Sequence, residues 1–238
     1  MSGERVELDR VEFAWQSQTF RFSLTVEAGQ IMAIIGPSGS GKSTLLDMVA
    51  GFIVPASGFV RIGGQDMAGL EPEERPVSMM FQDNNLFSHL SVADNAGLAL
   101  SSSLKLDAGQ REAVREALAR TGLEGKEARL PYELSGGERQ RAALARTLLM
   151  DRPVLLLDEP FASLGPALRA EMLALVTALH AERRMTILLV THQPEDARML
   201  SDRIALVVDG QVDSVGTPEE MLDGSKGGRI ADYLGRTS

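Results

Sequence analysis

Apolar and polar residues alternate strictly at positions 20–26 near the start of the chain, and Val6, Leu8, Val11 and Phe13 indicate an earlier strand. A period of two is typical of strands that bury one face. We therefore expect an antiparallel β part at the start of the fold. The run Ile31–Ile35 is uninterrupted instead, and it leads through glycine-rich sequence into Lys42–Ala50, which has helical spacing. This order predicts a buried strand, a loop and a helix.

Short apolar runs recur further along the chain, most of them separated by stretches of helical spacing such as 167–183. Strands that alternate with helices are typical of an α/β fold with a largely parallel sheet. These additional strands are expected at 77–81, 154–157, Thr186–Val190 and 204–208.

The pattern changes in the middle of the chain, where 111–120 and 138–150 have helical spacing and no convincing strand intervenes. We expect residues 91–150 to form an inserted helical subdomain. Residues 1–90 and 151–238 would then form the catalytic core with its antiparallel β part, all within one domain.

Two local signals organise the C-terminal region. Asp209 and Gly210 lie between apolar residues, which predicts a tight hairpin. Thr217 is then expected to cap a last helix that has Pro218 at its first position and Glu220 reaching back to the cap.

The composition excludes several classes of function. The 238 residues include 24 Lys and Arg against 33 Asp and Glu, a formal net charge of −9, and no cysteine. An acidic surface disfavours nucleic-acid binding, and the lack of cysteine excludes thiol nucleophiles, Cys-ligated zinc and iron–sulfur clusters. The start of the chain does not resemble a secretory signal, and its apolar stretches are shorter than the roughly 18 residues of a membrane span. We expect a cytoplasmic protein that reaches a membrane only through a partner.

The segment GPSGSGKST at positions 36–44 matches the pattern G-x-x-x-x-G-K-[ST] between a predicted strand and a predicted helix. Glycines let backbone N–H groups converge on phosphate oxygens, and the helix N-terminus adds partial positive charge. Lys42 would contact the β- and γ-phosphates, Ser43 would ligate Mg²⁺, and Thr44 would assist at the α-phosphate. The alternative is a glycine-rich turn that matches the pattern by chance. The predicted strand before it and the predicted helix after it argue against that alternative. The expected nucleotide-binding residues are Gly36, Pro37, Ser38, Gly39, Ser40, Gly41, Lys42, Ser43 and Thr44.

Two carboxylates follow the apolar run 154–157. Side chains at the carboxyl end of a buried strand face the crevice where α/β sheets bind ligands. We expect Asp158 to hold Mg²⁺, directly or through water, and Glu159 to act as the general base for the attacking water. The alternative is a pair of acidic residues that cap the next helix.

The sequence Leu134-Ser135-Gly136-Gly137-Glu138 resembles the LSGGQ signature of ATP-binding cassette ATPases, with Glu138 where Gln is usual. Gln82, Asp158-Glu159 and His192 occur in the order of that family's other motifs. The resemblance covers nearly the whole chain. It implies a P-loop NTPase fold: an ABC nucleotide-binding domain with a RecA-like core, an antiparallel β subdomain and a helical subdomain.

The resemblance also implies site residues. Two copies of the chain would meet head to tail, so that Ser135, Gly136 and Gly137 of one bind the γ-phosphate of ATP held by the other. Three further roles follow from the family: His192 as the switch residue at the γ-phosphate, Gln82 as a contact of Mg²⁺ or the attacking water, and Trp15 as an adenine-stacking residue, with core packing as its alternative.

The chain departs from the family after Glu159. Where the family usually has S-A-L-D, this sequence has Ala162-Ser163-Leu164-Gly165. The missing carboxylate normally helps to couple the two ATP sites, so Gly165 puts the strength of that coupling in doubt. We expect ATPase activity to survive.

Four segments, 21–27, 50–58, 75–90 and 104–106, are similar to the ATP-binding subunits of bacterial thiamine importers. This implies ATP-driven uptake of thiamine or thiamine phosphate with two copies of the chain, a transmembrane permease and a periplasmic thiamine-binding protein. The chain would then lie at the cytoplasmic face of the inner membrane. Leu86 and Phe87 would face the permease or pack the subdomain. Alternatives are import of a polyamine, iron or sulfate, a soluble non-transport cassette ATPase, and a GTPase or kinase.

Overall fold

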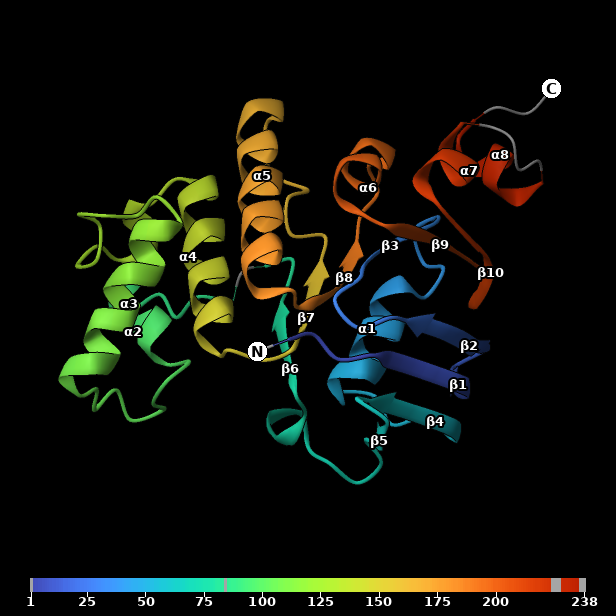
Figure 1. The fold of residues 1–238 in the computed structure, drawn as a ribbon, viewed down its shortest axis with the longest axis horizontal. Coiled ribbons are helices and arrows are strands. Elements are labelled where there is room, and N and C mark those ends of the chain that lie inside the picture. Colours follow the sequence, from blue (N-terminus) through green and yellow to red (C-terminus); the bar gives the residue numbers. More distant parts are fainter. Residues whose placement is uncertain (1, 84, 224–227, 236–238) are drawn as a thin grey trace.

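The computed structural model describes residues 2–83, 85–223 and 228–235, and its main feature is one curled sheet of ten strands (Figure 1). The strands are β1 (Val6–Trp15), β2 (Gln18–Val26), β3 (Ile31–Ile35), β4 (Ser57–Ile62), β5 (Gln65–Asp66), β6 (Val77–Met80), β7 (Val154–Asp158), β8 (Thr186–Val190), β9 (Arg203–Val208) and β10 (Gln211–Gly216).

The sheet has two parts in the order β5-β4-β1-β2-β10-β9-β3-β8-β7-β6. Strands β5, β4, β1 and β2 pair antiparallel, whereas β9, β3, β8, β7 and β6 pair parallel. The two parts join where β10 meets β2 through the single pair Gln211 and Arg21. The predicted α/β fold with a largely parallel sheet and an antiparallel N-terminal part is confirmed.

Helices cover both faces of the parallel part. They are α1 (Lys42–Ala50), α2 (Val92–Gly97), α3 (Ala108–Arg120), α4 (Gly136–Leu149), α5 (Pro166–Arg183), α6 (Pro194–Leu200), α7 (Pro218–Leu222) and α8 (Arg229–Tyr233), with short 3-10 helices η1 (Pro72–Glu74) and η2 (Pro131–Glu133). Along the described part of the chain, none of the helices combines the length and apolarity that crossing a membrane requires.

Strand β7 shows how the core is divided. Val154 and Leu156 are buried in the cluster that includes α1 and the antiparallel strands, whereas Leu155 and Leu157 are buried in the cluster that includes α4 and α5. Alternate side chains of a strand face opposite sides of the sheet, so an uninterrupted apolar run needs cover on both faces. The carboxyl end of β7, where Asp158 lies, is thereby held between two packed layers.

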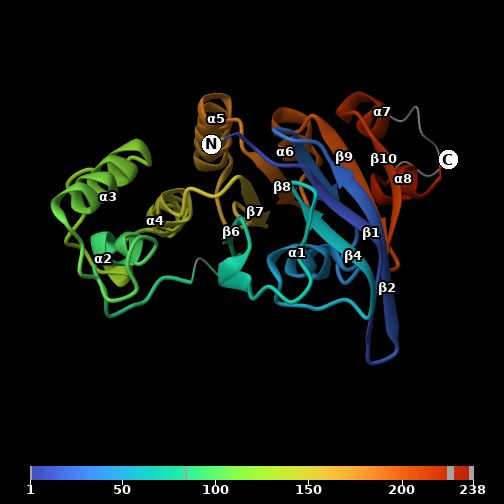
Figure 2. The same cartoon turned by 60° about the horizontal axis from the view of Figure 1, so that its bottom comes forward.

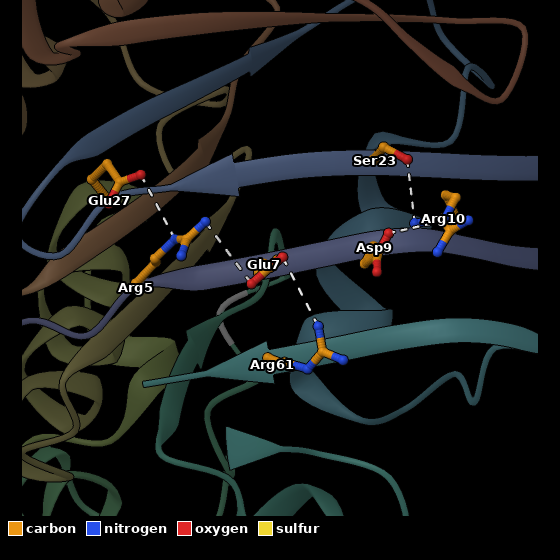
Figure 3. Close-up of polar contacts among 7 residues, drawn as sticks. All are labelled: Arg5, Glu7, Asp9, Arg10, Ser23, Glu27 and Arg61. Carbon is orange, nitrogen blue, oxygen red and sulfur yellow. Dashed lines mark hydrogen bonds and ion pairs between the residues drawn. The ribbon is translucent and has the colours of Figure 1, made fainter. Parts of the chain in front are cut away.

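The outer face of the antiparallel part is polar (Figure 3). Arg5, just before β1, forms ion pairs with Glu7 of that strand and with Glu27, and Glu7 also pairs with Arg61 of β4 at 4.0 Å. Exposed pairs of this kind contribute little stability. They keep one face of the layer in water while its other face packs on α1.

A bulge interrupts the pairing of β1 at Asp9 and Arg10. Arg10 has a left-handed φ of 48°, and its N–H donates to the Ser23 hydroxyl at 3.2 Å (Figure 3). A side chain at Gly58 would lie only 2.3 Å from the Arg10 carbonyl oxygen. Glycine at position 58 therefore allows β4 to approach the bulged strand, which increases local twist.

Helix α4 belongs to two parts of the molecule. Leu144 and Leu148 are buried with α5 and the parallel strands, whereas Ala142 and Ala145 are buried with α2 and α3. Figure 2 shows α2, α3 and α4 together at one end of the molecule. Helix α4 therefore contributes to both clusters and does not mark a boundary between them. The division of the chain at residues 91 and 150 stays a prediction.

Helix boundaries differ from the sequence expectations at two capped starts. The helix expected at 111–120 begins at Ala108 because Asp107 accepts from the Gln110 N–H, and the one expected at 138–150 begins at Gly136 because Ser135 caps it. Local polar side chains thus extended both helices beyond their apolar stripes. Five short strands and α-helices were not expected from the sequence patterns: β4, β5, α2, α6 and α8.

The two C-terminal signals are confirmed, but the helix that Thr217 caps is not the last one, because α8 follows it. Asp209 and Gly210, with φ of 50° and 75°, connect the antiparallel strands β9 and β10. Thr217 accepts a hydrogen bond from the Glu220 N–H, and the Glu220 carboxylate accepts from the Thr217 N–H in return. This capping box starts α7, with Pro218 at the first helical position.

One buried cation fixes the far end of α1. Arg75 is 3% exposed and donates to the carbonyl oxygens of Met48 and Val49 in the last turn of that helix, at 2.8 and 3.1 Å. A guanidinium at a helix C-terminus complements the partial negative charge there. Burial lowers the pKa of Arg75. Arg75 thereby positions the helix whose opposite end begins at the glycine-rich loop.

Candidate functional site

The glycine-rich loop at positions 36–41 connects the buried strand β3 to α1 and contains three glycines with positive φ: Gly36 at 149°, Gly39 at 75° and Gly41 at 100°. A Cβ on Gly36 would lie 2.0 Å from the Val207 carbonyl oxygen, and one on Gly41 would lie 2.6 Å from the Phe20 ring. The backbone of Gly39 needs glycine for its φ alone, since a Cβ there would meet nothing within 4 Å.

Lys42, the first residue of α1, folds back over this loop. It is 4% exposed, and its Nζ donates to the carbonyl oxygens of Gly36 and Pro37 at 3.0 and 2.8 Å. Burial lowers the pKa of Lys42, while the nearby carboxylates of Glu159 and Asp158 oppose this change. The ammonium is thereby held against the backbone of the glycine-rich loop.

A hydroxyl and a carboxylate meet where α1 approaches β7. The Ser43 Oγ donates to Asp158 Oδ1 at 3.2 Å. Burial raises the pKa of Asp158, and burial together with Asp158 raises the pKa of Asp47, one turn further along α1, to about 6. A cation bound beside such carboxylates would favour their charged forms.

These residues fit Mg²⁺ in chemical type. A hydroxyl and a carboxylate supply the hard oxygen ligands that Mg²⁺ prefers, and in nucleotide sites the remaining ligands are commonly water and phosphate. Among the described residues, no group of three or more His, Cys, Asp or Glu side chains is arranged to hold a metal. Ser43 and Asp158 would therefore need the nucleotide to complete a coordination shell.

Glu159 and His192 form the second polar pair of the site. His192 Nε2 lies 2.6 Å from Glu159 Oε1, and the Glu159 side chain is only 17% exposed. Glu159 adopts a left-handed φ of 46°, and its N–H donates to the Val190 carbonyl of β8 at 3.1 Å. Backbone strain of this kind clusters at active sites. The strain and the hydrogen bond aim the carboxylate at His192.

A cavity of 330 Å³ brings the loop and this pair together. It is lined by Gln18, Phe20, Ser38, Gly39, Gly41, Lys42, Ser43, Thr44, Glu159 and His192. All of these lining residues except Gln18 and Phe20 were expected from the sequence. The expected residues Gly36, Pro37, Ser40 and Asp158 are not among the lining.

Three residues of the site were not singled out from the sequence. Gln18 Nε2 donates to the Gly39 carbonyl oxygen at 3.3 Å, and Phe20 packs against Gly41. Tyr233 of α8 is hydrogen-bonded to the backbone of Gly36, while burial raises the pKa of its phenol. Gln18 and Phe20 belong to a strand with alternating apolar residues. That pattern indicates that one face is buried but not which segment packs against it. No local signal connects Tyr233 to a loop almost 200 positions earlier.

Trp15 and Gln82 lie outside the lining of this cavity. Trp15 is 63% exposed at the end of β1, and its ring stacks on Phe13 with centroids 6.4 Å apart. Core packing therefore does not account for Trp15. Gln82 is exposed just after β6. Both side chains are accessible to a ligand or to another chain.

The sequence Ser135–Gly137 lies apart from the glycine-rich loop, at the start of α4 (Figures 1 and 2). The Ser135 Oγ accepts from the Glu138 N–H at 3.3 Å, and Glu138 in turn accepts from the Ser135 N–H at 2.7 Å. Lys126 also pairs with the Glu138 carboxylate. The Lys126 hydrogen bond, followed by the Ser135 N–H, lowers the pKa of Glu138 to about 2.

The two glycines after Ser135 have different surroundings. A Cβ on Gly137 would lie 2.0 Å from a methyl carbon of Leu168, so glycine allows α4 to pack against α5. A Cβ on Gly136 would meet only Arg139, at 3.9 Å. The fold of a single chain explains Gly137 and gives no packing reason for Gly136.

Gly165 occupies the N-cap position of α5. Its φ of −66° and ψ of 161° are open to any residue, and its cap lacks a side-chain hydrogen bond. A Cβ at this position would meet nothing within 4 Å. Neither backbone conformation nor packing thus requires glycine in place of the aspartate that the resemblance leads one to expect.

The chain is similar to known proteins over nearly its full length. Residues 20–162 match the ABC transporter family. The thiamine import ATP-binding protein ThiQ of Mesorhizobium japonicum is 56% identical, over 99% of this chain and 93% of the relative. The protein of the same name from Shigella boydii is 51% identical, over 92% of this chain and 94% of the relative.

Solved structures agree with this relationship. A dimeric ATP-binding cassette in a post-hydrolysis state, bound to ADP and Pi, has a TM-score of 0.79 at 28% identity, covering 90% of this chain and 98% of the other. CbiO1 from Clostridium perfringens, part of an ABC transporter complex, has a TM-score of 0.82 at 28% identity, covering 92% and 91%. Together with the geometry of the glycine-rich loop, these matches show that the chain belongs to the ABC transporter family of ATP-binding proteins.

Proposed function

We propose that this chain is the ATP-binding and ATP-hydrolysing subunit of an importer for thiamine or thiamine phosphate. One observation carries the ATPase: the cavity that places Lys42, Ser43 and the Glu159–His192 pair around a single space. The thiamine assignment is supported by the 56% identical relative, which is itself named as a thiamine import protein.

Each residue of the cavity has a chemical role in this proposal. The backbone N–H groups of positions 36–41 and the start of α1 receive the phosphates, and Lys42 exchanges its two carbonyl contacts for phosphate oxygens. When bound by Ser43 and Asp158, Mg²⁺ would neutralise developing phosphate charge. Gln82 would contact Mg²⁺ or the attacking water from the end of β6.

The proposed general base is Glu159, which removes a proton from the water that attacks the γ-phosphate. His192, 2.6 Å from the Glu159 carboxylate, orients that carboxylate and is positioned to contact the γ-phosphate. Trp15 is proposed to stack on adenine, because its ring is 63% exposed at the end of β1.

A second copy of the chain would complete the site. Gly136 is open to its surroundings and has no packing reason to be glycine, which suits close approach of a phosphate from outside the chain. We therefore propose a head-to-tail dimer in which Ser135, Gly136 and Gly137 of one copy contact the γ-phosphate held by the other. The dimeric ADP-bound relative supports this arrangement.

The proposed membrane partner is a permease that contacts the segment after Gln82. Phe87 is 50% exposed, whereas Leu86 is partly buried against the clusters around α5 and around α2 and α3. Leu86 thus packs the chain and Phe87 faces outward. The chain would lie at the cytoplasmic face of the membrane, held by the permease, and a periplasmic thiamine-binding protein would deliver the solute.

The experiment is co-purification followed by uptake. The chain should co-purify with a permease, and its deletion should abolish uptake of labelled thiamine, with restoration by the wild-type gene. Unchanged thiamine uptake together with lost uptake of a polyamine, iron or sulfate would transfer the assignment to that solute. A strong preference for GTP over ATP in the isolated chain would overturn the ATPase assignment itself.

A further inference from the structure

Asn95 of α2 is fully buried, with 0% exposure, and its side-chain amide is bonded to the segment that precedes the helix. Its Oδ1 accepts from the Phe87 N–H at 2.7 Å. Its Nδ2 donates to the carbonyl oxygens of Phe87, Leu90 and Ser91, each at 3.0 Å. One buried side chain therefore holds both ends of the turn at 87–91.

This set of contacts needs an amide. The Phe87 N–H needs an acceptor, and the two N–H bonds of Asn95 Nδ2 are shared among three carbonyl oxygens. The Phe87 and Ser91 carbonyls also accept from the backbone N–H groups of Leu90 and Asn95. The orientation of the Asn95 amide follows from these contacts. An aspartate would keep the acceptor and lose the donors, and a leucine would lose both. A buried polar group without its partner is costly, so the backbone path of the turn depends on this residue.

The side chains of the same turn face outward. Phe87 is 50% exposed, and its ring meets the His89 ring edge-on with centroids 6.0 Å apart. Just before the turn, the Asn85 carbonyl accepts from Arg146 of α4 at 2.7 Å. The segment 85–91 is thus held by two side chains, Arg146 and Asn95, and presents an aromatic pair on its outer side.

We propose that Asn95 is a positioning residue: it holds Phe87 outward for the permease and so lets changes at the nucleotide site reach that partner. This proposal rests on the function proposed above, in which the permease contacts Phe87. Asn95 touches neither nucleotide nor permease. It acts through the backbone of the turn.

The test compares two variants of the assembled transporter. Asn95→Asp keeps the shape of the side chain and removes the donors to the turn. Thr121→Val is the matched control, because Thr121 is 1% exposed and its hydroxyl donates to Ala117 and Leu118 at the end of its own helix. Both changes remove buried hydrogen bonds from the same group of helices, and only the first concerns the turn.

For Asn95→Asp we expect basal ATP hydrolysis of the isolated chain to stay within about twofold of wild type. The stimulation of hydrolysis by the assembled permease and solute should fall about tenfold. Thr121→Val should keep the stimulation. Equal loss in both variants, or full stimulation in Asn95→Asp, would overturn the proposal.

A second measurement needs no variant. In wild-type chain, the Phe87 amide should exchange its hydrogen at least about tenfold more slowly than an unprotected amide in the same sequence. Unprotected exchange would overturn the proposal even where Asn95→Asp does not fold. A wild-type complex that assembles and is stimulated by another solute refutes only the thiamine assignment. A chain that binds no permease refutes both proposals.

Discussion

Two glycine-containing motifs of this chain each lie at the start of a helix, and their surroundings differ. In the loop at 36–41, the glycines have positive φ, and the lysine that follows is 4% exposed. At Ser135–Gly137, the serine serves as a helix cap, one glycine packs against α5, and the other faces open space. The first motif belongs to a cavity of its own chain, whereas the second is a helix end that lies apart from it.

The charged groups around the two motifs also differ. Lys42 lies among Glu159 and Asp158, whose charges favour its protonated form against burial. The start of α4 instead has a carboxylate, Glu138, that is neutralised by Lys126. A paired carboxylate leaves the helix N-terminus more favourable to an arriving anion than an unpaired one would. In the proposed function, the first region would bind and activate ATP, and the second would complete the site of another copy.

The largest expected effect is on chemistry in the first region. Glu159→Gln should lower ATP hydrolysis by about a thousandfold because the proton acceptor is lost. ATP binding should persist, and a closed dimer should accumulate, measured by phosphate release, nucleotide affinity and light scattering. Turnover near the wild-type rate would show that Glu159 is not the base.

Lys42→Ala is the contrasting variant for the same region. It removes a charged donor from the phosphates, so nucleotide affinity should fall by about tenfold or more. Affinity is measured by equilibrium titration with labelled ATP. Unchanged affinity would mean that backbone N–H groups alone carry the binding.

Variants of the two glycines at Ser135–Gly137 should distinguish an effect on folding from an effect on dimer assembly. Gly137→Ala should lower the free energy of unfolding by about 1–3 kcal/mol, because its Cβ would overlap Leu168. Gly136→Ala should change that free energy by less than about 0.5 kcal/mol. It should still weaken ATP-dependent dimerisation in the Glu159→Gln background.

Denaturant titration and light scattering measure the two effects. Adding Leu168→Ala to Gly137→Ala should restore part of the lost stability, since it removes the overlapping methyl groups. Unimpaired dimerisation of the Gly136→Ala variant would argue against the proposed contact between the two copies.

Gly165→Asp tests a neighbouring departure from the family. The backbone and the space are compatible with aspartate, so its N-cap carboxylate should raise the free energy of unfolding by a few tenths of a kcal/mol. Steady-state ATPase activity should stay within about twofold, with Gly165→Ala as the control that lacks a carboxylate. A large gain in activity would show that the native glycine weakens coupling between the sites.

The smallest effect concerns pH. The pKa of Glu138 is lowered from 4.5 to about 2 in the folded chain, so its contribution to stability is present above pH 4.5 and is lost as pH falls toward 2. The stability difference between wild type and Glu138→Gln should shrink over that window. Thermal unfolding at several pH values measures it. In a Lys126→Met background, where the main cause of the shift is absent, most of this pH dependence should disappear.

Much of the first region could be predicted because its signals are contiguous. The uninterrupted run Ile31–Ile35, the glycines and Lys42–Ala50 follow one another, so the strand, loop and helix were expected where they occur. The carboxylates after the buried run of β7 were found by the same reasoning. The extra elements β4, β5, α2, α6 and α8 were missed because they are short and carry weak periodicity.

Contacts between distant segments had no such signal. The hydropathy pattern does not predict which residues contact Gly36, yet Tyr233 and Val207 both do so. Nor does spacing indicate that Arg75 caps α1 or that Asn95 holds the turn at 87–91. The partners of such buried polar groups are decided by how helices and strands pack.

The amino-acid sequence by itself determined the strand–loop–helix unit, the position of the two carboxylates after β7's apolar run and the order of the motifs, because each depends on neighbouring residues and on periodicity. Only the tertiary structure decided that Glu159 pairs with His192, that Gly137 serves packing while Gly136 faces outward, and that Phe87 is more exposed than Leu86. The reason is physical: exposure and pairing are properties of packed layers, which local sequence does not specify.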